Sequence, residues 1–307
     1  MNLPAPVFTI AEKPIFQSKS MSNLRLIATD IDGTLANNQG ELAPETIAVL
    51  RALLRRDIPV TLVTGLNPWP VRRYLAQINR GQHFPELRAI TLNGIFLLEG
   101  EELHEGCFTA PEIIREAIAV MLKSQHVPLV FGEDGITRFF PLSEGMATVE
   151  ALIAARPYQP FEAVATVEAL FTVRPALVSM TGTAEEAAEL YPRLETAVGA
   201  RAYVVYQPGM QRSWVEVNHR EARKDVALLA LAARLNVTPE EILYFGDSLN
   251  DLPVFEVVSH AVAVENARPE VKARAWRIAP SNDAAGVARF LSELFENGES
   301  DDQPEGS

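Results

Sequence analysis

The sequence predicts an α/β protein: a Rossmann-like parallel-sheet core with an inserted α+β cap domain. Short apolar strands alternate with amphipathic helices in the first and last thirds of the chain, which is typical of a parallel sheet covered by helices on both faces. The middle third instead places a hairpin signal among helices, which is typical of an antiparallel module. Open α/β sheets bind ligands beyond the carboxyl ends of their strands. The residues at those ends are therefore the first candidates for a functional site.

The first half of the core is expected to begin near residue 22. Its predicted elements are a strand at Leu24–Thr29, a helix at Pro44–Arg56, a strand at Pro59–Val63, a helix at Val71–Ile78 and a strand at Ala89–Leu92. Pro44 suits the first turn of a helix, and an apolar stripe runs along it, formed by Ile47, Leu50, Leu53 and Leu54. We assign residues 22–99 to the core.

The cap is expected to span residues 100–212. Strands at Pro128–Phe131 and Ile136–Phe140 flank the sequence Gly132-Glu133-Asp134-Gly135, which predicts a hairpin. The other expected elements are helices at Pro111–Lys123 and Ala184–Val198 and strands at Ala176–Met180 and Ala202–Tyr206. This mixture predicts an α+β module.

The alternating pattern is expected to return after the cap, so residues 213–296 complete the core. The predicted elements are strands at Trp214–Val217, Ile242–Phe245 and Ala261–Val264 and helices at Lys224–Leu235, Asn250–Val257 and Ala284–Phe295. Residues 1–21, with three prolines, are expected to form a disordered arm, and the acidic, Gly/Ser-containing residues 297–307 a disordered tail.

Composition narrows the class of protein. The chain has 307 residues, 48% hydrophobic and 22% charged, with a formal net charge of −13. An acidic balance of this size argues against nucleic acid and anionic membrane as partners. The single cysteine, Cys107, excludes an internal disulfide and fits a reducing cytoplasm. No apolar run approaches the ~18 residues that a membrane span requires. We therefore expect a cytoplasmic protein, and the sequence leaves its oligomeric state open.

The most informative stretch is Asp30-Ile31-Asp32-Gly33-Thr34-Leu35, which follows the first predicted strand. A tight turn there would let Asp30 and Asp32 face one small volume. One carboxylate can then attack phosphorus while the other transfers a proton. Because like charges repel, a divalent cation would be needed beside them.

Three further segments bear polar groups at the end of a predicted strand or at the start of a predicted helix. Thr64 and Gly65 end the second predicted strand with a hydroxyl and an unobstructed backbone N–H, and Lys224 opens a helix. The segment Gly246-Asp247-Ser248-Leu249-Asn250-Asp251 follows the strand at Ile242–Phe245 and adds two acids and an amide.

These four segments together resemble the haloacid dehalogenase superfamily of phosphohydrolases, in particular its Cof-type branch with a large α/β cap. The resemblance covers about residues 24–294. The first motif, Asp30 to Leu35, and the last, Gly246 to Asp251, are complete, and Asn93-Gly94 and Asn266-Ala267 match turns usual in this branch. Four motifs in this order are specific, whereas any one alone is weaker.

The resemblance implies the roles of the acidic residues. Asp30 resembles the nucleophile that forms an aspartyl-phosphate, and Asp32 resembles the acid/base that protonates the leaving oxygen and then activates water. Asp247 resembles a ligand of Mg²⁺, beside Asp30 and the carbonyl of Asp32. Asp251 resembles the acid that supports the metal's water or orients the lysine.

The resemblance also implies a phosphate-binding set. Thr64 and Lys224 correspond to its hydroxyl and ammonium, Gly65 offers its N–H, and Asn250 corresponds to a residue that touches phosphate or the metal shell. Charge supports a metal independently, because close carboxylates repel by about 4 kcal/mol per contact at an effective dielectric of ~20. The single positive charge of Lys224 cannot offset the repulsion among several carboxylates and a phosphate. A hard dication can offset it.

Two positions depart from the branch. Leu66 stands where arginine is frequent, which puts an inherited substrate contact in doubt, and Asp225 stands where glycine is frequent. Asp225 is expected to favour the positive end of the helix that Lys224 opens. The five histidines show no metal-ligand spacing and are taken as structural or solvent-facing.

The leading functional prediction is a Mg²⁺-dependent phosphatase that acts on a small phosphorylated metabolite, with a sugar phosphate implied by the resemblance. Two alternatives stay open. A phosphomutase shares the aspartyl-phosphate step but returns the phosphoryl group to a sugar. A non-catalytic sensor of a phosphorylated ligand could retain the same fold, and Leu66 is the feature that favours it.

Overall fold

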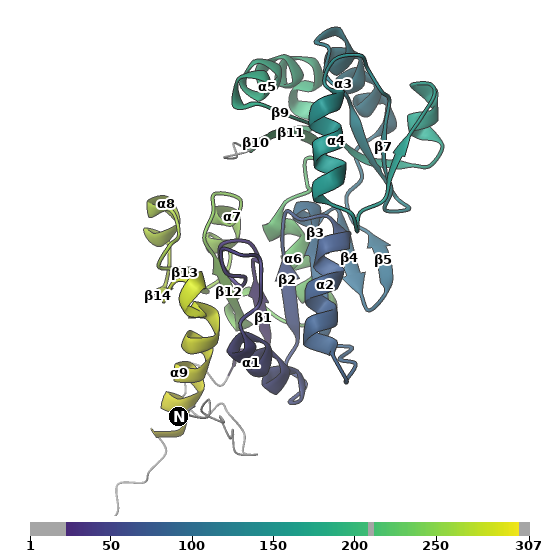
Figure 1. Cartoon of the computed structure of the whole chain (residues 1–307). Helices are drawn as coiled ribbons and strands as arrows, with labels where there is room; N and C mark the ends of the chain where they lie inside the picture. Colours follow the sequence, from purple (N-terminus) through teal and green to yellow (C-terminus); the bar gives the residue numbers. More distant parts are fainter. Residues whose placement is uncertain (1–22, 208–211, 301–307) are drawn as a thin grey trace, which may run out of the picture. The chain divides into compact units, whose positions relative to one another are not determined.

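The computed structural model describes residues 23–207 and 212–300. The predicted arm at residues 1–21 lies outside the described residues, as does the predicted tail beyond residue 300. Two sheets and their accompanying helices make up the described chain (Figure 1). The prediction of an α/β protein with a parallel sheet is confirmed.

The larger sheet has eight strands, in the order β14–β13–β12–β1–β2–β3–β4–β5. They are β1 (Leu26–Thr29), β2 (Val60–Val63), β3 (Leu87–Thr91), β4 (Phe96–Glu99), β5 (Glu102–Glu105), β12 (Ile242–Gly246), β13 (His260–Val264) and β14 (Arg277–Ala279). β1 runs parallel to both β2 and β12, and β12, β13 and β14 are also mutually parallel. Every residue of β1, β2 and β12 is buried, as expected for strands covered on both faces.

The hairpin of β4 and β5 was not predicted from the sequence. β3 pairs antiparallel with β4, and β4 pairs antiparallel with β5. The turn between them contains Gly100 at φ +61°, a left-handed conformation that glycine adopts without strain. Residue 100, where the cap was expected to start, therefore lies inside this hairpin, and the residue bounds of core and cap stay a prediction.

The smaller sheet has six strands, in the order β10–β11–β9–β6–β7–β8. They are β6 (Leu129–Gly132), β7 (Thr137–Phe139), β8 (Phe161–Ala163), β9 (Pro175–Gly182), β10 (Tyr203–Gln207) and β11 (Ser213–Asn218). All of its pairs are antiparallel except β7–β8. The hairpin predicted around residues 132–135 is confirmed as β6–β7.

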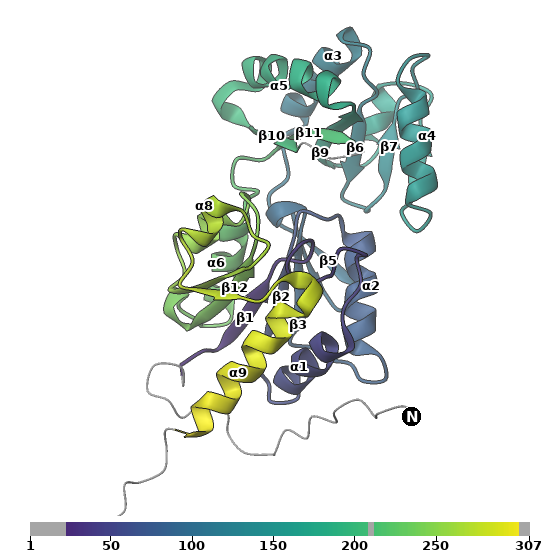
Figure 2. The ribbon, with the colours of Figure 1, turned by 60° about the vertical axis from the view of Figure 1, so that its left-hand side comes forward.

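Two helices pack side by side on one face of the smaller sheet. They are α3 (Pro111–Lys123) and α5 (Ala184–Val198), and Figure 2 shows them along the strands β9–β11. Val178, Val215 and Val217 lie beneath them in one hydrophobic cluster. A third helix, α4 (Met146–Ala155), contributes Val149 and Leu152 to a separate cluster. The smaller sheet therefore has one face that is apolar and covered.

One strand was assigned to the wrong sheet. The strand predicted at Trp214–Val217 was expected to resume the parallel core, but it is β11, which pairs antiparallel with β9 and β10. An alternating apolar pattern predicts a strand with one buried face, and it does not identify the sheet that the strand joins.

The remaining helices are α1 (Pro44–Leu54), α2 (Pro68–Asn79), α6 (Lys224–Arg234), α7 (Leu252–Phe255), α8 (Pro269–Lys272) and α9 (Gly286–Ser300). α9 lies against α1 in both views (Figures 1 and 2). Because α9 continues to Ser300, the backbone of residues 297–300, predicted to begin the disordered tail, is helical.

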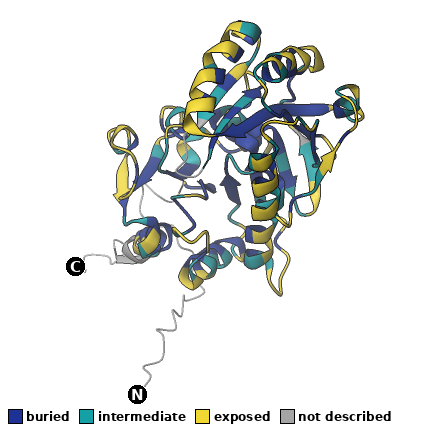
Figure 3. Cartoon of the chain, turned by 45° about the horizontal axis from the view of Figure 1, so that its top comes forward, coloured by how far each residue is buried: buried dark blue, intermediate teal, exposed yellow. Residues whose placement is uncertain are grey.

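Figure 3 shows buried strands and helices whose outer faces are exposed. Among the described residues, no helix combines the length and apolarity needed to cross a bilayer.

Contacts divide the chain into two compact units. Of the described residues, the first unit comprises residues 23–62, 77–87 and 232–300, and the second comprises residues 63–76, 88–207 and 212–231. Asp30 and Asp247 belong to the first unit, whereas Thr64 and Lys224 belong to the second.

Candidate active site

Three carboxylates meet where two parallel strands of the first unit end. Asp30 follows β1, Asp247 follows β12, and Asp251 lies four residues further on. One oxygen from each lies within 4.8 Å of the others. Asp30 and Asp251 are buried and Asp247 is half-buried. The structure thus brings together three of the predicted site residues.

The strand register explains why Asp30 and Asp247 emerge together. Thr29, the last residue of β1, is the partner of Phe245 in β12. The N–H of Asp30 donates to the carbonyl oxygen of Phe245 at 2.9 Å, so the two strands end at almost the same level. Carboxylates that follow neighbouring parallel strands then share one edge of the sheet.

The turn after Asp30 packs directly on Asp247. The N–H groups of residues 34, 35 and 36 all donate to the carbonyl oxygen of Ile31, at 3.2, 3.0 and 2.9 Å. The Thr34 hydroxyl donates to Oδ1 of Asp247 at 2.9 Å. Gly33 has φ +78°, and a Cβ placed there would lie 2.7 Å from Oδ2 of Asp247. A glycine is therefore required both by the backbone conformation and by the approach of the carboxylate.

Substitution of Gly33, together with a control glycine, distinguishes the effect of the backbone conformation from the effect of the contact with Asp247. Gly33→Ala should cost about 1–2 kcal/mol for the left-handed backbone, and it should also displace the Asp247 carboxylate. Gly81→Ala is the matched control, because Gly81 has φ +81° and an added Cβ there meets no atom within 4 Å. Thermal unfolding should show similar losses in both variants, whereas assays of the catalytic activity should show a loss in Gly33→Ala alone. Equal activity in the two variants would contradict the importance of the Gly33–Asp247 contact.

Asp251 holds the loop that carries Asp247. Its Oδ1 accepts a hydrogen bond from the Tyr244 hydroxyl at 2.6 Å. Its Oδ2 accepts from the N–H groups of Asp247 and Ser248, at 3.1 and 2.9 Å. Burial raises the pKa of Tyr244 well above its usual value, and the negative charge of Asp251 acts in the same direction. The hydroxyl therefore remains a donor that fixes Asp251 in place.

Tyr244 is a site residue that the sequence reading missed. It lies in β12, which was read only as a buried apolar strand, and its side chain is completely buried. The signal that could have identified it is the phenol itself, because a buried tyrosine hydroxyl generally requires a partner.

Tyr244→Phe should destabilise the protein, because a buried carboxylate oxygen loses its donor. The expected loss in the free energy of unfolding is about 1–3 kcal/mol, measured by denaturant titration. Tyr203→Phe is the matched control, because Tyr203 is 49% exposed. A Tyr244→Phe variant as stable as the control would show that the hydrogen bond to Asp251 contributes nothing.

The donor set of this cluster fits a hard divalent cation. All three groups offer carboxylate oxygens, which are the ligands that Mg²⁺ prefers. Without a cation, carboxylates about 4 Å apart would repel by about 4 kcal/mol at an effective dielectric of ~20. The cluster thus has the chemistry of a metal site.

Two other predicted residues lie in the loops that carry these carboxylates. Asp32 is exposed in the turn after β1, where it bridges to Ala36 through the backbone, and it is not part of the cluster of three. Asn250 is exposed in the loop before α7.

The second unit brings Thr64 close to the start of α6. The carbonyl oxygen of Thr64 accepts the N–H of Asn93 at 2.9 Å. A Cβ at Gly94, the next residue, would lie 2.9 Å from Cβ of Ala227 and 3.0 Å from the carbonyl oxygen of Arg223. The Asn93-Gly94 turn therefore lies against both Thr64 and the helix that Lys224 opens. Thr64 and Lys224 are each only 1% exposed.

The two departures from the branch have local structural roles. The N–H of Leu66 donates to the Thr64 hydroxyl oxygen at 3.0 Å, so the backbone of Leu66 orients the hydroxyl whatever its side chain. The carboxylate of Asp225 accepts two hydrogen bonds from Arg223, at 3.0 and 2.7 Å. Asp225 lies in the first turn of α6, as expected from the helix dipole, and also pairs with the preceding arginine.

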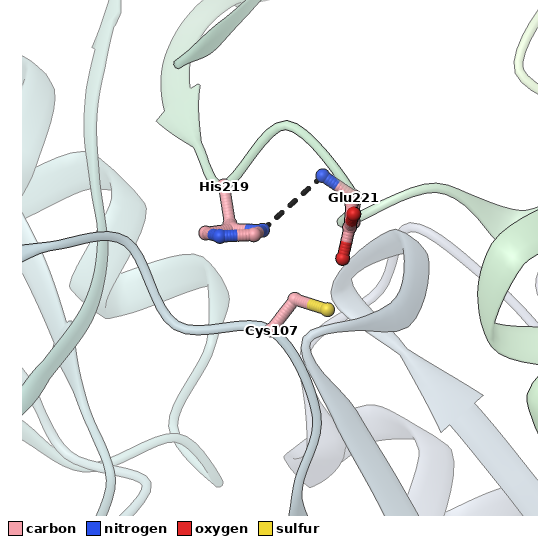
Figure 4. Close-up of side chains that lie close together, drawn as sticks. All are labelled: Cys107, His219 and Glu221. Atoms are coloured by element: carbon pink, nitrogen blue, oxygen red, sulfur yellow. Dashed lines mark hydrogen bonds between the residues drawn. The ribbon is translucent and has the colours of Figure 1, made fainter. Parts of the chain in front are cut away.

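A second group of potential metal ligands lies in the second unit. Cys107, His219 and Glu221 each offer a ligand atom within 4.8 Å of the others (Figure 4). Sequence spacing could not identify this group, because Cys107 is remote in the chain from the other two. The Nδ1 atom of His219 already accepts the N–H of Glu221 at 3.2 Å, and the Glu221 side chain is exposed. The group is therefore not preorganised for a metal.

Comparison with known proteins agrees with this fold. The haloacid dehalogenase-like hydrolase family profile matches residues 27–291. The HMP-PP phosphatase of Serratia proteamaculans is 28% identical over 250 residues, which cover 81% of this chain and 86% of that protein. The HMP-PP phosphatase of Klebsiella pneumoniae is 27% identical over 281 residues, which cover 89% and 96%.

A solved structure shows the same fold. The crystal structure of a haloacid dehalogenase-like hydrolase from Bacteroides thetaiotaomicron aligns with a TM-score of 0.77 at 19% identity. The alignment covers 88% of this chain and 99% of that one.

The fold and the family match thus define a hydrolase built on a largely parallel sheet. The chain belongs to the haloacid dehalogenase-like hydrolases, as its motifs predicted. Its reaction class is that of a phosphoric monoester hydrolase, so the prediction of a phosphatase is confirmed at this level.

Proposed function

We propose that the protein is a Mg²⁺-dependent phosphatase that hydrolyses a small phosphorylated metabolite, a sugar phosphate, through an aspartyl-phosphate on Asp30. The observation that carries the proposal is the approach of the Asp30, Asp247 and Asp251 oxygens within 4.8 Å at the ends of β1 and β12. Asp30, Asp247 and the backbone carbonyl of Asp32 would hold the metal. When bound, Mg²⁺ would offset the carboxylate and phosphate charges.

In the proposed reaction, one carboxylate acts as the nucleophile and a second acts as the acid/base. An oxygen of Asp30 attacks phosphorus, and the bond from phosphorus to the leaving oxygen breaks while Asp32 gives that oxygen a proton. In the second step Asp32 takes a proton from water, the water oxygen attacks phosphorus, and the bond to Asp30 breaks to release phosphate. The exposed position of Asp32 is compatible with contact to substrate and water.

The phosphate oxygens would be bound by the second unit. Thr64 and Gly65 would offer a hydroxyl and an N–H, Lys224 its ammonium, and Asn250 of the first unit an amide. The proximity of Thr64 and the start of α6 to the Asn93-Gly94 turn supports this assignment.

A phosphate-release screen tests the proposal. Sugar phosphates, nucleotides, flavin phosphates and, because two relatives carry that name, HMP-PP are each assayed with Mg²⁺ and with excess EDTA. We expect release from a sugar phosphate alone, without a bisphosphate activator, and none in EDTA. Transfer without net release would instead identify a phosphomutase. Tight phosphate binding without turnover of any ester would identify a sensor.

A further inference from the structure

The turn that carries Asp32 is held from outside by two side-chain amides. The Asn266 amide donates to the carbonyl oxygen of Gly33 at 2.7 Å, and the Asn282 amide donates to the carbonyl oxygen of Ala36 at 3.0 Å. Gly33 follows Asp32 directly, and Ala36 is the residue to which Asp32 bridges through the backbone. The two amides therefore fix the turn on either side of Asp32.

The two asparagines also hold each other. The N–H of Asn282 donates to Oδ1 of Asn266 at 2.9 Å. Asn266 thus donates through one side-chain atom and accepts through the other, which determines the orientation of its amide, because a carbonyl only accepts and an N–H only donates. Asn282 is only 4% exposed, and it also donates to Oδ1 of Asn38 at 3.3 Å. A buried amide is costly to leave unpaired, so its contact with Ala36 is favoured.

The loops that carry the two asparagines are anchored within the first unit. In the loop after β13, the N–H of Arg268 donates to the carbonyl oxygen of Asp247 at 3.0 Å. This loop therefore contacts the segments that follow both β1 and β12. In the loop after β14, a Cβ at Gly286 would lie 1.8 Å from the carbonyl oxygen of Pro280. The chain is packed too closely there for a side chain, and this close packing holds Asn282 in place.

The position of Asp32 depends on its backbone. Asp32 is exposed, so packing does not enclose its side chain. General acid–base catalysis contributes about 10²–10⁴-fold, and it requires the group to lie within hydrogen-bond reach of the atom that exchanges the proton. A displacement of about 1 Å can cost about a hundredfold. Residues that fix the backbone beside Asp32 can therefore control catalysis without touching the substrate.

We propose that Asn266 and Asn282 are positioning residues, which hold the turn so that Asp32 reaches the leaving oxygen. The inference rests on the proposed function, in which Asp32 gives its proton to that oxygen as the bond to phosphorus breaks. The alkoxide of an alkyl phosphate is a poor leaving group and needs the proton, whereas p-nitrophenolate is a stable anion that leaves without one. Loss of either asparagine should therefore impair the hydrolysis of alkyl phosphates selectively.

The test compares an alkyl phosphate with p-nitrophenyl phosphate, using the full-length protein with Mg²⁺. Asn266→Ala and Asn282→Ala should each lower kcat/KM for the best alkyl phosphate of the phosphate-release screen by about ten- to a hundredfold. For p-nitrophenyl phosphate, kcat/KM should fall by less than about threefold, because cleavage of that ester needs no proton. Asn266 is exposed, so its variant still tests the inference if the buried Asn282→Ala variant does not fold.

A double-variant cycle shows whether the asparagines act through Asp32. Asp32→Asn alone should lower kcat/KM for the alkyl phosphate by about a hundredfold or more. In that background, Asn266→Ala should add less than about threefold, because residues that act through one group are not additive with its removal.

Asn79→Ala is the matched control for folding. Oδ1 of Asn79 accepts the N–H of Phe84 at 3.2 Å in the loop after α2, so this variant also loses a side-chain hydrogen bond in the first unit. It should keep the wild-type ratio of the two activities. Equal losses on the two esters in the Asn266→Ala variant, no loss on either, or a full additional loss in the Asp32→Asn background would overturn the inference alone. A wild type inactive on every alkyl phosphate, or an Asp32→Asn variant with wild-type activity, would overturn the proposed function and the inference with it.

Discussion

Asp30→Asn should abolish phosphate release while leaving the protein folded. The amide cannot serve as the nucleophile, so kcat should fall by about 10⁴-fold or more, as measured by phosphate release from the best substrate of the screen. The same change removes one of three clustered negative charges. The free energy of unfolding without Mg²⁺ should therefore stay the same or rise, which denaturant titration measures.

Asp57→Asn is the matched control for this variant. Asp57 is exposed beyond the end of α1 and has φ +56°, a conformation that asparagine also adopts readily. The control should retain wild-type activity and stability. An Asp30→Asn variant that keeps most of its activity would exclude Asp30 as the nucleophile.

Removal of divalent metal should have a comparable effect. Excess EDTA should reduce turnover below about 1% of its starting value, because a dication is then no longer present to offset the clustered carboxylates and the phosphate. Addition of Mg²⁺ beyond the chelator should restore activity and raise the midpoint of thermal unfolding. The repulsion among Asp30, Asp247 and Asp251 is the physical reason for both effects.

Asp247→Asn links this metal effect to a specific residue. The variant loses one ligand charge, so the Mg²⁺ concentration for half-maximal activity should rise by about tenfold or more. Asp57→Asn should show the wild-type Mg²⁺ dependence. Full activity in excess chelator, or an unchanged Mg²⁺ dependence in Asp247→Asn, would contradict the metal assignment.

Local patterns were enough to predict most of the parallel sheet. An apolar run followed at once by acid and glycine placed Asp30 at the end of β1, and the same logic placed Asp247 at the end of β12. Both predictions depend only on the chain next to the residue. These predictions succeed because a buried parallel strand has a nearly continuous apolar sequence and is followed by polar residues.

Features that depend on distant partners could not be predicted in the same way. Trp214–Val217 was correctly predicted as a strand but assigned to the wrong sheet, because its pairing with β9 and β10 is not encoded in its own alternation. The hairpin of β4 and β5 and the role of Tyr244 as donor to Asp251 were missed for related reasons.

The most direct test of the account is a search for the covalent intermediate. The protein is mixed with its best substrate and Mg²⁺, stopped with acid during turnover, digested and examined by mass spectrometry. We predict an added mass of about 80 Da, one phosphoryl group replacing a proton, on Asp30. The Asp30→Asn variant should show none. Substrate turnover with no phosphoryl group on Asp30, or with one on another residue, would contradict the account.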